Sequence, residues 1–354
     1  MTWAEEADAL YDADRWDDAG VALVELLCER PGDARAWYRL GNVRSHQKRD
    51  MDALDCFRRA LAIAPVNAQM LNNLGAACER LGRRREAQEA YERAQGADPG
   101  LFEPYLNLGR FWESEGDLAA AAGYLRAGLE RHPNHPMLVH LLAAATNVQS
   151  AQAPREHIAS YFDGFAAGFD AHLHSLGYRI PAELAALVQP HLARGAQVVD
   201  LGCGTGQVGK ALADAAVRLV GVDISPRMLE VAGLHGVYAE LLLADAATAL
   251  QAMAPGLADL VTAADVFIYI GDLRQVFEAT ARALRPGGLL AFSVETLSRG
   301  EYRLLSNGRY SHSREYLARL AAAFAFEQLS ARSIPIRRQG TGFAQGDLLL
   351  LRRM

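Results

Sequence analysis

Three glycines at alternating positions follow an apolar run near the middle of the chain. Gly202, Gly204 and Gly206 come directly after residues 197–201, and Asp200 stands two residues before the first glycine. Glycine allows a ligand to lie against bare backbone and permits left-handed dihedral angles. A dinucleotide site has the spacing Gly-x-Gly-x-x-Gly, which differs from this one. A carboxylate at such a turn suits a cationic ligand, directly or through water, and would repel a pyrophosphate.

A second acidic residue ends the next apolar run. Residues 217–222 read as a strand that ends in Asp223. A carboxylate at a strand tip can accept hydrogen bonds from both hydroxyls of a ribose, each contributing about 1.5–3 kcal/mol. Ile224 and Met228 follow where apolar side chains can enclose an adenine ring. These residues predict a nucleoside site.

The third predicted strand is also followed by an acidic residue. Residues 240–243 lead to Asp245 and Ala246, and Asp245 is placed to accept from the exocyclic amine of adenine. Acids at strand ends are ordinarily turn or helix-cap residues. Three of them together with a glycine turn favour cofactor binding.

The rest of this half alternates strands and helices, as parallel α/β sheets do. A fourth strand (259–265), a helix (273–284), a fifth strand (289–294) and a final hairpin (326–336 and 347–351) are predicted. Over about residues 180–354 this succession resembles the class I S-adenosylmethionine (SAM)-dependent methyltransferases. The resemblance implies a Rossmann-like, seven-stranded sheet of order 3-2-1-4-5-7-6 with strand 7 antiparallel. It also implies SAM as cofactor and S-adenosylhomocysteine as product.

The methyl acceptor is expected beyond the fourth and fifth strands, at the open end of the sheet. Candidate substrate-binding residues are Tyr269, Glu295, Arg309 and Tyr310, and Asp265 is a candidate for contact with both cofactor and acceptor. A carboxylate acceptor needs no base, whereas a hydroxyl or amine acceptor is served by one. His312 and Asp265 are the candidate catalytic bases. Segment 301–313 is interpreted as a substrate loop or, alternatively, as an ordinary surface connection.

Two chemistries are disfavoured. The fourth strand lacks the Asn/Asp-Pro-Pro-Tyr motif of amino-nucleobase methyltransferases, which argues against DNA adenine methylation. Cys203 belongs to the glycine turn and is not interpreted as a methyl-accepting thiol. Seven histidines between His132 and His191 have irregular spacing, so no metal site is expected.

Residues 147–180 are predicted to connect two domains. Residues 147–154 have linker composition, and 155–173 read as one helix with an apolar stripe that includes Phe162, Phe165 and Phe169. This helix either packs on the domain core or, by the family resemblance, forms a lid over the cofactor. In the second case Tyr161, Phe162 and Arg179 border the methionine end of SAM.

Residues 1–146 repeat themselves with a period of 34. The period is carried by Pro31, Pro65, Pro99 and Pro133, and by Gly41, Gly75 and Gly109. A fixed period of this length indicates a helical repeat array. The pattern resembles the tetratricopeptide repeat, with four repeats and a capping helix at 137–146. The whole chain thus resembles bacterial predicted methyltransferases with such repeats, an α-solenoid followed by an α/β domain at 181–354.

Arrays of this kind present a concave groove that takes an extended peptide or a helix. Asn42, Asn73 and Asn107 fall on the predicted first helices of the repeats, where an amide can pair with a peptide backbone. Alternatively, these asparagines face water or bond within a turn. The groove is expected to bind a peptide or protein, with docking on the catalytic domain or on a second copy of the chain as the alternatives.

Composition restricts the partners further. The net charge of −6 over 354 residues gives no reason to expect nucleic acid. No apolar run approaches the roughly 20 residues of a membrane span. The N-terminus lacks the pattern of a signal peptide. We therefore expect a cytoplasmic protein.

The leading interpretation is methyl transfer to oxygen or nitrogen of a peptide or protein held by the repeats. One alternative is a small-molecule methyltransferase whose repeats serve dimerisation. Another is a repeat scaffold whose second domain senses SAM without catalysis. A nicotinamide dehydrogenase competes at the level of the fold.

Overall fold

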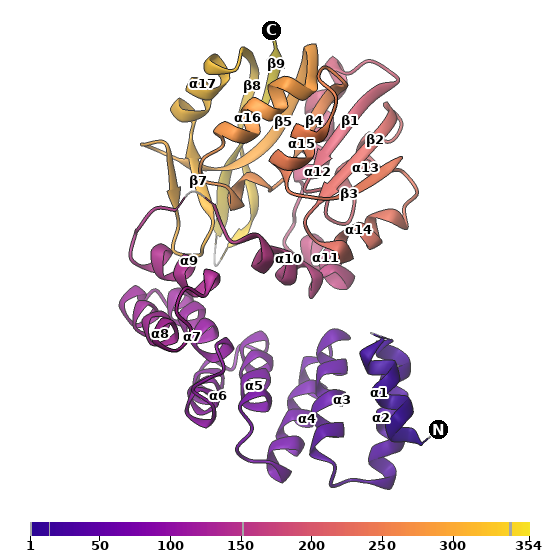
Figure 1. The fold of residues 1–354 in the computed structure, drawn as a ribbon, viewed down its shortest axis with the longest axis vertical. Coiled ribbons are helices and arrows are strands. Elements are labelled where there is room, and N and C mark those ends of the chain that lie inside the picture. Colours follow the sequence, from indigo (N-terminus) through magenta and orange to yellow (C-terminus); the bar gives the residue numbers. More distant parts are fainter. Residues whose placement is uncertain (1, 14, 151, 340–341) are drawn as a thin grey trace. The chain divides into compact units, whose positions relative to one another are not determined.

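The computed structural model describes residues 2–13, 15–150, 152–339 and 342–354. The chain forms two compact units, Met1–Thr146 and Asn147–Met354. The first unit is helical and the second contains a mixed sheet with helices on both faces (Figure 1). No described helix is both long and apolar enough to span a membrane.

The first unit consists of antiparallel helix pairs. Its helices are α1 (Trp3–Asp12), α2 (Trp16–Glu29), α3 (Ala34–His46), α4 (Asp50–Ile63), α5 (Ala68–Arg80), α6 (Arg84–Ala97), α7 (Glu103–Ser114), α8 (Leu118–Arg131) and α9 (Pro136–Ala145). The pairs α1/α2, α3/α4, α5/α6 and α7/α8 are the four predicted repeats, and α9 follows them where the capping helix is predicted.

The periodic glycines allow the two helices of a repeat to approach. A Cβ atom at Gly41 would lie 2.5 Å from the ring of Phe57, and one at Gly75 would lie 2.6 Å from the ring of Tyr91. Phe57 and Tyr91 are fully buried in the second helices of their repeats. The glycine of the first helix therefore makes room for a large side chain of the second, which explains why glycine recurs at the same position of the repeats.

The second unit begins with short helices and then alternates strands with helices. The helices are α10 (Arg155–Asp163), η1 (Ala166–Gly168), α11 (Phe169–Ser175), α12 (Ile180–Val188), η2 (Gln189–His191), α13 (Gln207–Leu212), α14 (Pro226–Gly233), α15 (Ala246–Ala252), η3 (Phe267–Tyr269), α16 (Arg274–Ala283) and α17 (Arg314–Ala323). The strands are β1 (Ala196–Leu201), β2 (Ala216–Asp223), β3 (Glu240–Leu243), β4 (Ala258–Ala263), β5 (Leu284–Leu297), β6 (Tyr302–Leu304), β7 (Tyr310–Ser313), β8 (Phe326–Gln339) and β9 (Gly342–Arg353).

The sheet has the predicted order, with two additional strands. Strands β3-β2-β1-β4-β5 are parallel neighbours, β9 lies antiparallel to β5, and β8 pairs with β9. Thus β9 and β8 take the places of the expected strands 7 and 6. The prediction of seven strands is wrong because β6 and β7 extend the sheet, with Ser311–Ser313 parallel to Glu295–Leu297.

The predicted helix at 155–173 is also wrong in its extent. The segment divides into α10, η1 and α11, and α10 ends at Asp163 with Gly164 as its C-cap. The aromatic stripe satisfies a helical period, but Asp163 and Asp170 bond to the turns after β2 and β1 on either side of the break. We call residues 155–175 the cap segment.

Candidate functional site

A cavity of about 250 Å³ lies at the carboxyl ends of β1, β2 and β4. Its floor includes the glycine turn, where Gly202 and Gly204 have φ of +58° and +53°. A side chain at Gly202 would collide with Val266, whereas the nearest atom to a Cβ at Gly204 would be Phe169, 3.8 Å away. Bare backbone therefore faces the cavity at Gly204. Gly206 does not line the cavity; it is the N-cap of α13 and lies beside Tyr238.

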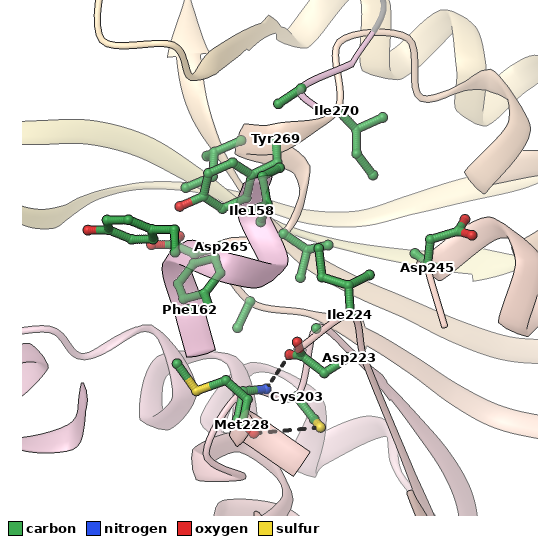
Figure 2. A pocket seen from close by; sticks show the side chains of 18 of the residues that line it. Ile158, Phe162, Cys203, Asp223, Ile224, Met228, Asp245, Asp265, Tyr269 and Ile270 are labelled. Carbon is green, nitrogen blue, oxygen red and sulfur yellow. Dashed lines mark hydrogen bonds between the residues drawn. The ribbon is translucent and has the colours of Figure 1, made fainter. Parts of the chain in front are cut away.

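Asp223 lies at the tip of β2 and lines the cavity (Figure 2). Its Oδ2 accepts from the backbone N–H of Gly204 at 2.8 Å, and its Oδ1 accepts from that of Ser225 at 2.9 Å. Burial raises the pKa of the Asp223 carboxyl, against the lowering effect of these bonds. Each oxygen retains acceptor capacity, and Ile224 and Met228 line the wall beside it. This arrangement fits a ribose and an adenine.

Asp245 and Ala246 line the same cavity from the tip of β3. The Asp245 carboxylate accepts from the backbone N–H of Thr248 and forms an ion pair with Arg155 Nη1 at 2.8 Å. Burial raises the pKa of Asp245, but the bonds to Thr248 and the charge of Arg155 outweigh it and keep the pKa low. Asp245 therefore stays ionised and able to accept from an adenine amine.

Asp200 does not face the cavity, which corrects the predicted contact with a cationic ligand. The side chain is fully buried beneath the turn and accepts from the hydroxyls of Tyr238 and Thr262, both at 2.8 Å. Burial raises its pKa to about 6. Asp200 supports the turn from below and leaves ligand contact to the glycine backbone.

Two carboxylates that sequence reasoning left without a role hold the cap segment over the cavity. Asp170 accepts from Thr205 Oγ1 and from Gln207 Nε2, both at 2.5 Å, and so binds the glycine turn. Asp163 accepts from Ser225 Oγ at 2.6 Å and so binds the turn after β2. The only sequence signal for them is the motif Phe-Asp-x-x-Ala-x-x-Phe-Asp at 162–170.

With the Arg155–Asp245 ion pair, the cap segment is attached to the turns after β1, β2 and β3. The cap segment and the strand-end turns that line the cavity are thus linked by direct bonds. Predicted Arg179 does not line the cavity.

Aromatic side chains form the other end of the cavity. Phe162 from the cap segment stands edge-on to Tyr269 after β4, with ring centroids 5.8 Å apart, and Tyr161 packs against Phe162 at 5.4 Å. Figure 2 shows Phe162, Tyr269 and Asp265 near one another, on the side away from Asp245. This end is where an acceptor would meet the reactive group of the cofactor.

Asp265 lines the aromatic end in an unusual backbone conformation. Its φ is +55°, in the left-handed region. Its backbone N–H donates to Ser293 Oγ at 2.8 Å, and that hydroxyl donates back to Asp265 Oδ1 at 3.0 Å. Left-handed non-glycine residues concentrate at functional sites, and here the geometry directs the carboxylate to the cavity.

His312 is not placed to act as a base, which corrects the prediction. It is fully buried on β7, its Nε2 lies 3.0 Å from the carbonyl oxygen of Gly271, and its ring stacks on Tyr316. It does not line the cavity. Burial lowers the pKa of His312 to about 4. Its role is packing beneath the site.

Of the four predicted substrate-binding residues, two line the cavity and two are buried away from it. Tyr269 and Arg309 line the cavity, but Tyr310 and Glu295 do not. Tyr310 is fully buried and its hydroxyl lies 2.6 Å from Ser150 Oγ, so it holds the connector. Glu295 is buried behind Arg309.

The repeat asparagines bond to one another. Asn73 Nδ2 donates to Asn42 Oδ1 at 2.8 Å and to the hydroxyl of Tyr38 at 3.1 Å, and Asn107 Nδ2 donates to Asn72 Oδ1 at 2.9 Å. These bonds link successive repeats. Asn73 thus donates both amide hydrogens within the array and Asn107 donates one, and their assignment to substrate binding stays a prediction.

Comparisons with known proteins find the same two parts. Residues 199–292 match the methyltransferase domain model, and residues 32–99 and 74–136 match two tetratricopeptide repeat models. The chain combines tetratricopeptide repeats with a methyltransferase domain. The sheet order and the glycine turn of this domain are those expected for class I.

Relatives with curated names match about a third of the chain. The chain is 37% identical over 103 residues to a ubiquinone biosynthesis O-methyltransferase of Ralstonia nicotianae, covering 28% of this chain and 43% of that protein. It is 30% identical over 129 residues to the same-named enzyme of Xanthomonas oryzae pv. oryzae, covering 36% and 52%. The chain spans about half the length of the curated relatives it matches.

Solved structures are similar at low identity. The 1,6-didemethyltoxoflavin-N1-methyltransferase of Burkholderia thailandensis has a TM-score of 0.45 and 20% identity, over 58% of this chain and 92% of that one. A putative methyltransferase in a Haloferax volcanii complex with the Trm112 activator has a TM-score of 0.44 and 20% identity, over 54% and 96%.

Proposed function

We propose that this protein is a SAM-dependent methyltransferase. The observation that carries the proposal is the meeting of bare glycine backbone, the Asp223 carboxylate and an apolar adenine wall in one cavity. SAM supplies an electrophilic methyl group on its sulfonium. Asp223 accepts from the ribose, Asp245 accepts from the adenine, and the turn at Gly204 lets the methionine part lie on the backbone.

The remaining task of the chain is to position the acceptor, because methyl transfer from a sulfonium is an in-line displacement. Phe162 and Tyr269 exclude water from the aromatic end. Asp265 is the predicted base that lines the cavity, and it takes the proton where the acceptor is a hydroxyl or an amine.

For the acceptor, we propose oxygen or nitrogen of a peptide or protein recruited by the groove of the repeats. The support is the presence of tetratricopeptide repeats, which commonly bind peptides. The second candidate is a small molecule, with the repeats serving dimerisation. It is favoured by the O-methyltransferase names of the relatives.

Calorimetry with SAM tests the cofactor proposal. Asp223→Ala should lower the affinity for SAM by about tenfold or more, because charge-assisted bonds to the ribose are lost. Glu240→Ala is the control, because Glu240 is an exposed acid at the start of the neighbouring strand. NADH titrated in parallel should not bind. Unchanged SAM affinity in Asp223→Ala would refute the site.

A further inference from the structure

Arg309 enters the cavity from the acceptor side. It stands directly before β7, in a turn held by the bonds Leu305 N–H to Arg309 O at 2.7 Å and Arg309 N–H to Asn307 Oδ1 at 3.0 Å. The Arg309 side chain lines the cavity with Tyr269. The cofactor residues stand at the tips of β1–β3, so Arg309 belongs to the opposite end.

The guanidinium of Arg309 lacks a close acceptor within the described residues. Its ion pair is with Glu295 Oε1, and the separation from Arg309 Nη1 is 3.9 Å, which is too long for a hydrogen bond. A guanidinium has five N–H donors in a planar fork. Glu295 therefore balances the charge without satisfying the donors, and a partly buried group of this kind gains from an anionic ligand.

The surroundings keep this group charged and add suitable walls. Burial lowers the pKa of Arg309, but nearby Tyr269 and Glu295 outweigh burial and raise it. Tyr161 and Phe162 supply aromatic faces at the same end of the cavity. A planar apolar group can pack between such faces while an attached anion meets the guanidinium.

We propose that Arg309 binds a carboxylate of the methyl acceptor, and that the aromatic end holds a planar apolar group attached to it. This inference rests on the proposed function and names the acceptor class. A bidentate pair between guanidinium and carboxylate fixes both position and orientation. The same chemistry is offered by a free aromatic acid and by an aromatic residue at the C-terminus of a peptide.

Binding of small probes to the full chain saturated with S-adenosylhomocysteine tests the proposal. One pair of probes is benzoate and its neutral analogue benzamide, and the other is N-acetylphenylalanine and its amide. Ligand-observed NMR measures the binding of each probe. Each acid should bind about tenfold or more tightly than its amide. The tighter of the two acids indicates whether the source is a free acid or a peptide terminus.

Three variants assign the preference to the guanidinium. Arg309→Gln should abolish the preference for acid over amide while S-adenosylhomocysteine affinity stays unchanged. Arg303→Gln, at an exposed arginine of the adjacent β6, should retain it. Glu295→Gln should strengthen acid binding, because it removes the competing carboxylate behind Arg309.

Each contrary result has a definite meaning. Equal binding of acids and amides to the parent protein would overturn the inference, as would an acid preference that survives in Arg309→Gln. Loss of S-adenosylhomocysteine affinity in Arg309→Gln would assign the arginine to the cofactor and would also overturn it. A parent protein that does not bind S-adenosylhomocysteine would instead refute the proposed function.

Discussion

The acidic residues at the strand ends have different roles although their sequence settings look alike. Asp223 and Asp245 line the cavity, whereas Asp200 points beneath the glycine turn to Tyr238 and Thr262. Successive strand residues face opposite sides of a sheet. Asp200 lies within β1 rather than after it, so its side chain belongs to one face of the sheet and not to the open edge.

The burial of His312 has a measurable consequence for stability against pH. Its folded pKa of about 4 lies below the ordinary value of 6.5. Between these values the unfolded chain binds the proton and the folded protein does not, so the free energy of unfolding rises with pH. The contribution of His312 is present above about pH 6.5 and is lost as the pH falls towards 4.

We therefore expect denaturant unfolding of the second unit to depend less steeply on pH, between 4 and 6.5, in His312→Gln than in the parent. His235→Gln is the control, because His235 is exposed. The same dependence in both proteins would show that His312 is not buried in its neutral form. Methyl transfer should retain its pH profile in His312→Gln, because the residue lies outside the cavity.

At the scale of elements, the repeats depend on glycine at the helix–helix contact. Gly75→Ala would place a Cβ atom 2.6 Å from the ring of Tyr91. The Tyr91 ring is buried among other side chains. The added methyl group should therefore overpack the contact and lower the free energy of unfolding by about 1–3 kcal/mol. Thermal unfolding followed by circular dichroism measures the loss.

Gly96→Ala is the matched control in the same repeat. Gly96 lies in α6, and a Cβ atom there would meet nothing within 4 Å. Since glycine is a poor helix former, this variant should gain about 0.5–1 kcal/mol. Equal effects of the two substitutions would contradict the packing explanation for the repeat period.

The cap segment shows how far an element can be anticipated. Its aromatic spacing predicts one face directed at the core, and Phe162 does line the cavity. The break at Gly164 was not foreseen, because the helical period continues across it in the sequence. The break is decided by bonds to distant turns, such as Asp163 to Ser225 and Asp170 to Thr205.

At the scale of the whole molecule, an experiment can test whether the second unit binds the cofactor by itself and whether the repeats recruit the acceptor. All residues that line the cavity lie between Gln152 and Arg309, within the second unit. A chain of residues 147–354 should therefore bind S-adenosylhomocysteine as the full chain does. If the repeats recruit the acceptor, labelled SAM in cell extract should methylate proteins with the full chain only.

Mass spectrometry of the extract shows which proteins or small molecules carry the labelled methyl group. The full chain with Asp223→Ala serves as the control for background labelling. Equal protein labelling by the full chain and by residues 147–354 would refute recruitment by the repeats. Labelling confined to small molecules would favour the second candidate function.

The sequence by itself determined the order of most elements and the repeat period, and it singled out Asp223, Asp245, Ile224 and Met228, which line one cavity. These follow from local patterns, because glycine spacing and strand-end acids are read along the chain. Only the tertiary structure decided which acceptor candidates share the cavity. Arg309 reaches the cavity from the turn before β7, whereas Tyr310 and His312 are buried, because β7 pairs with β5 and becomes part of the sheet.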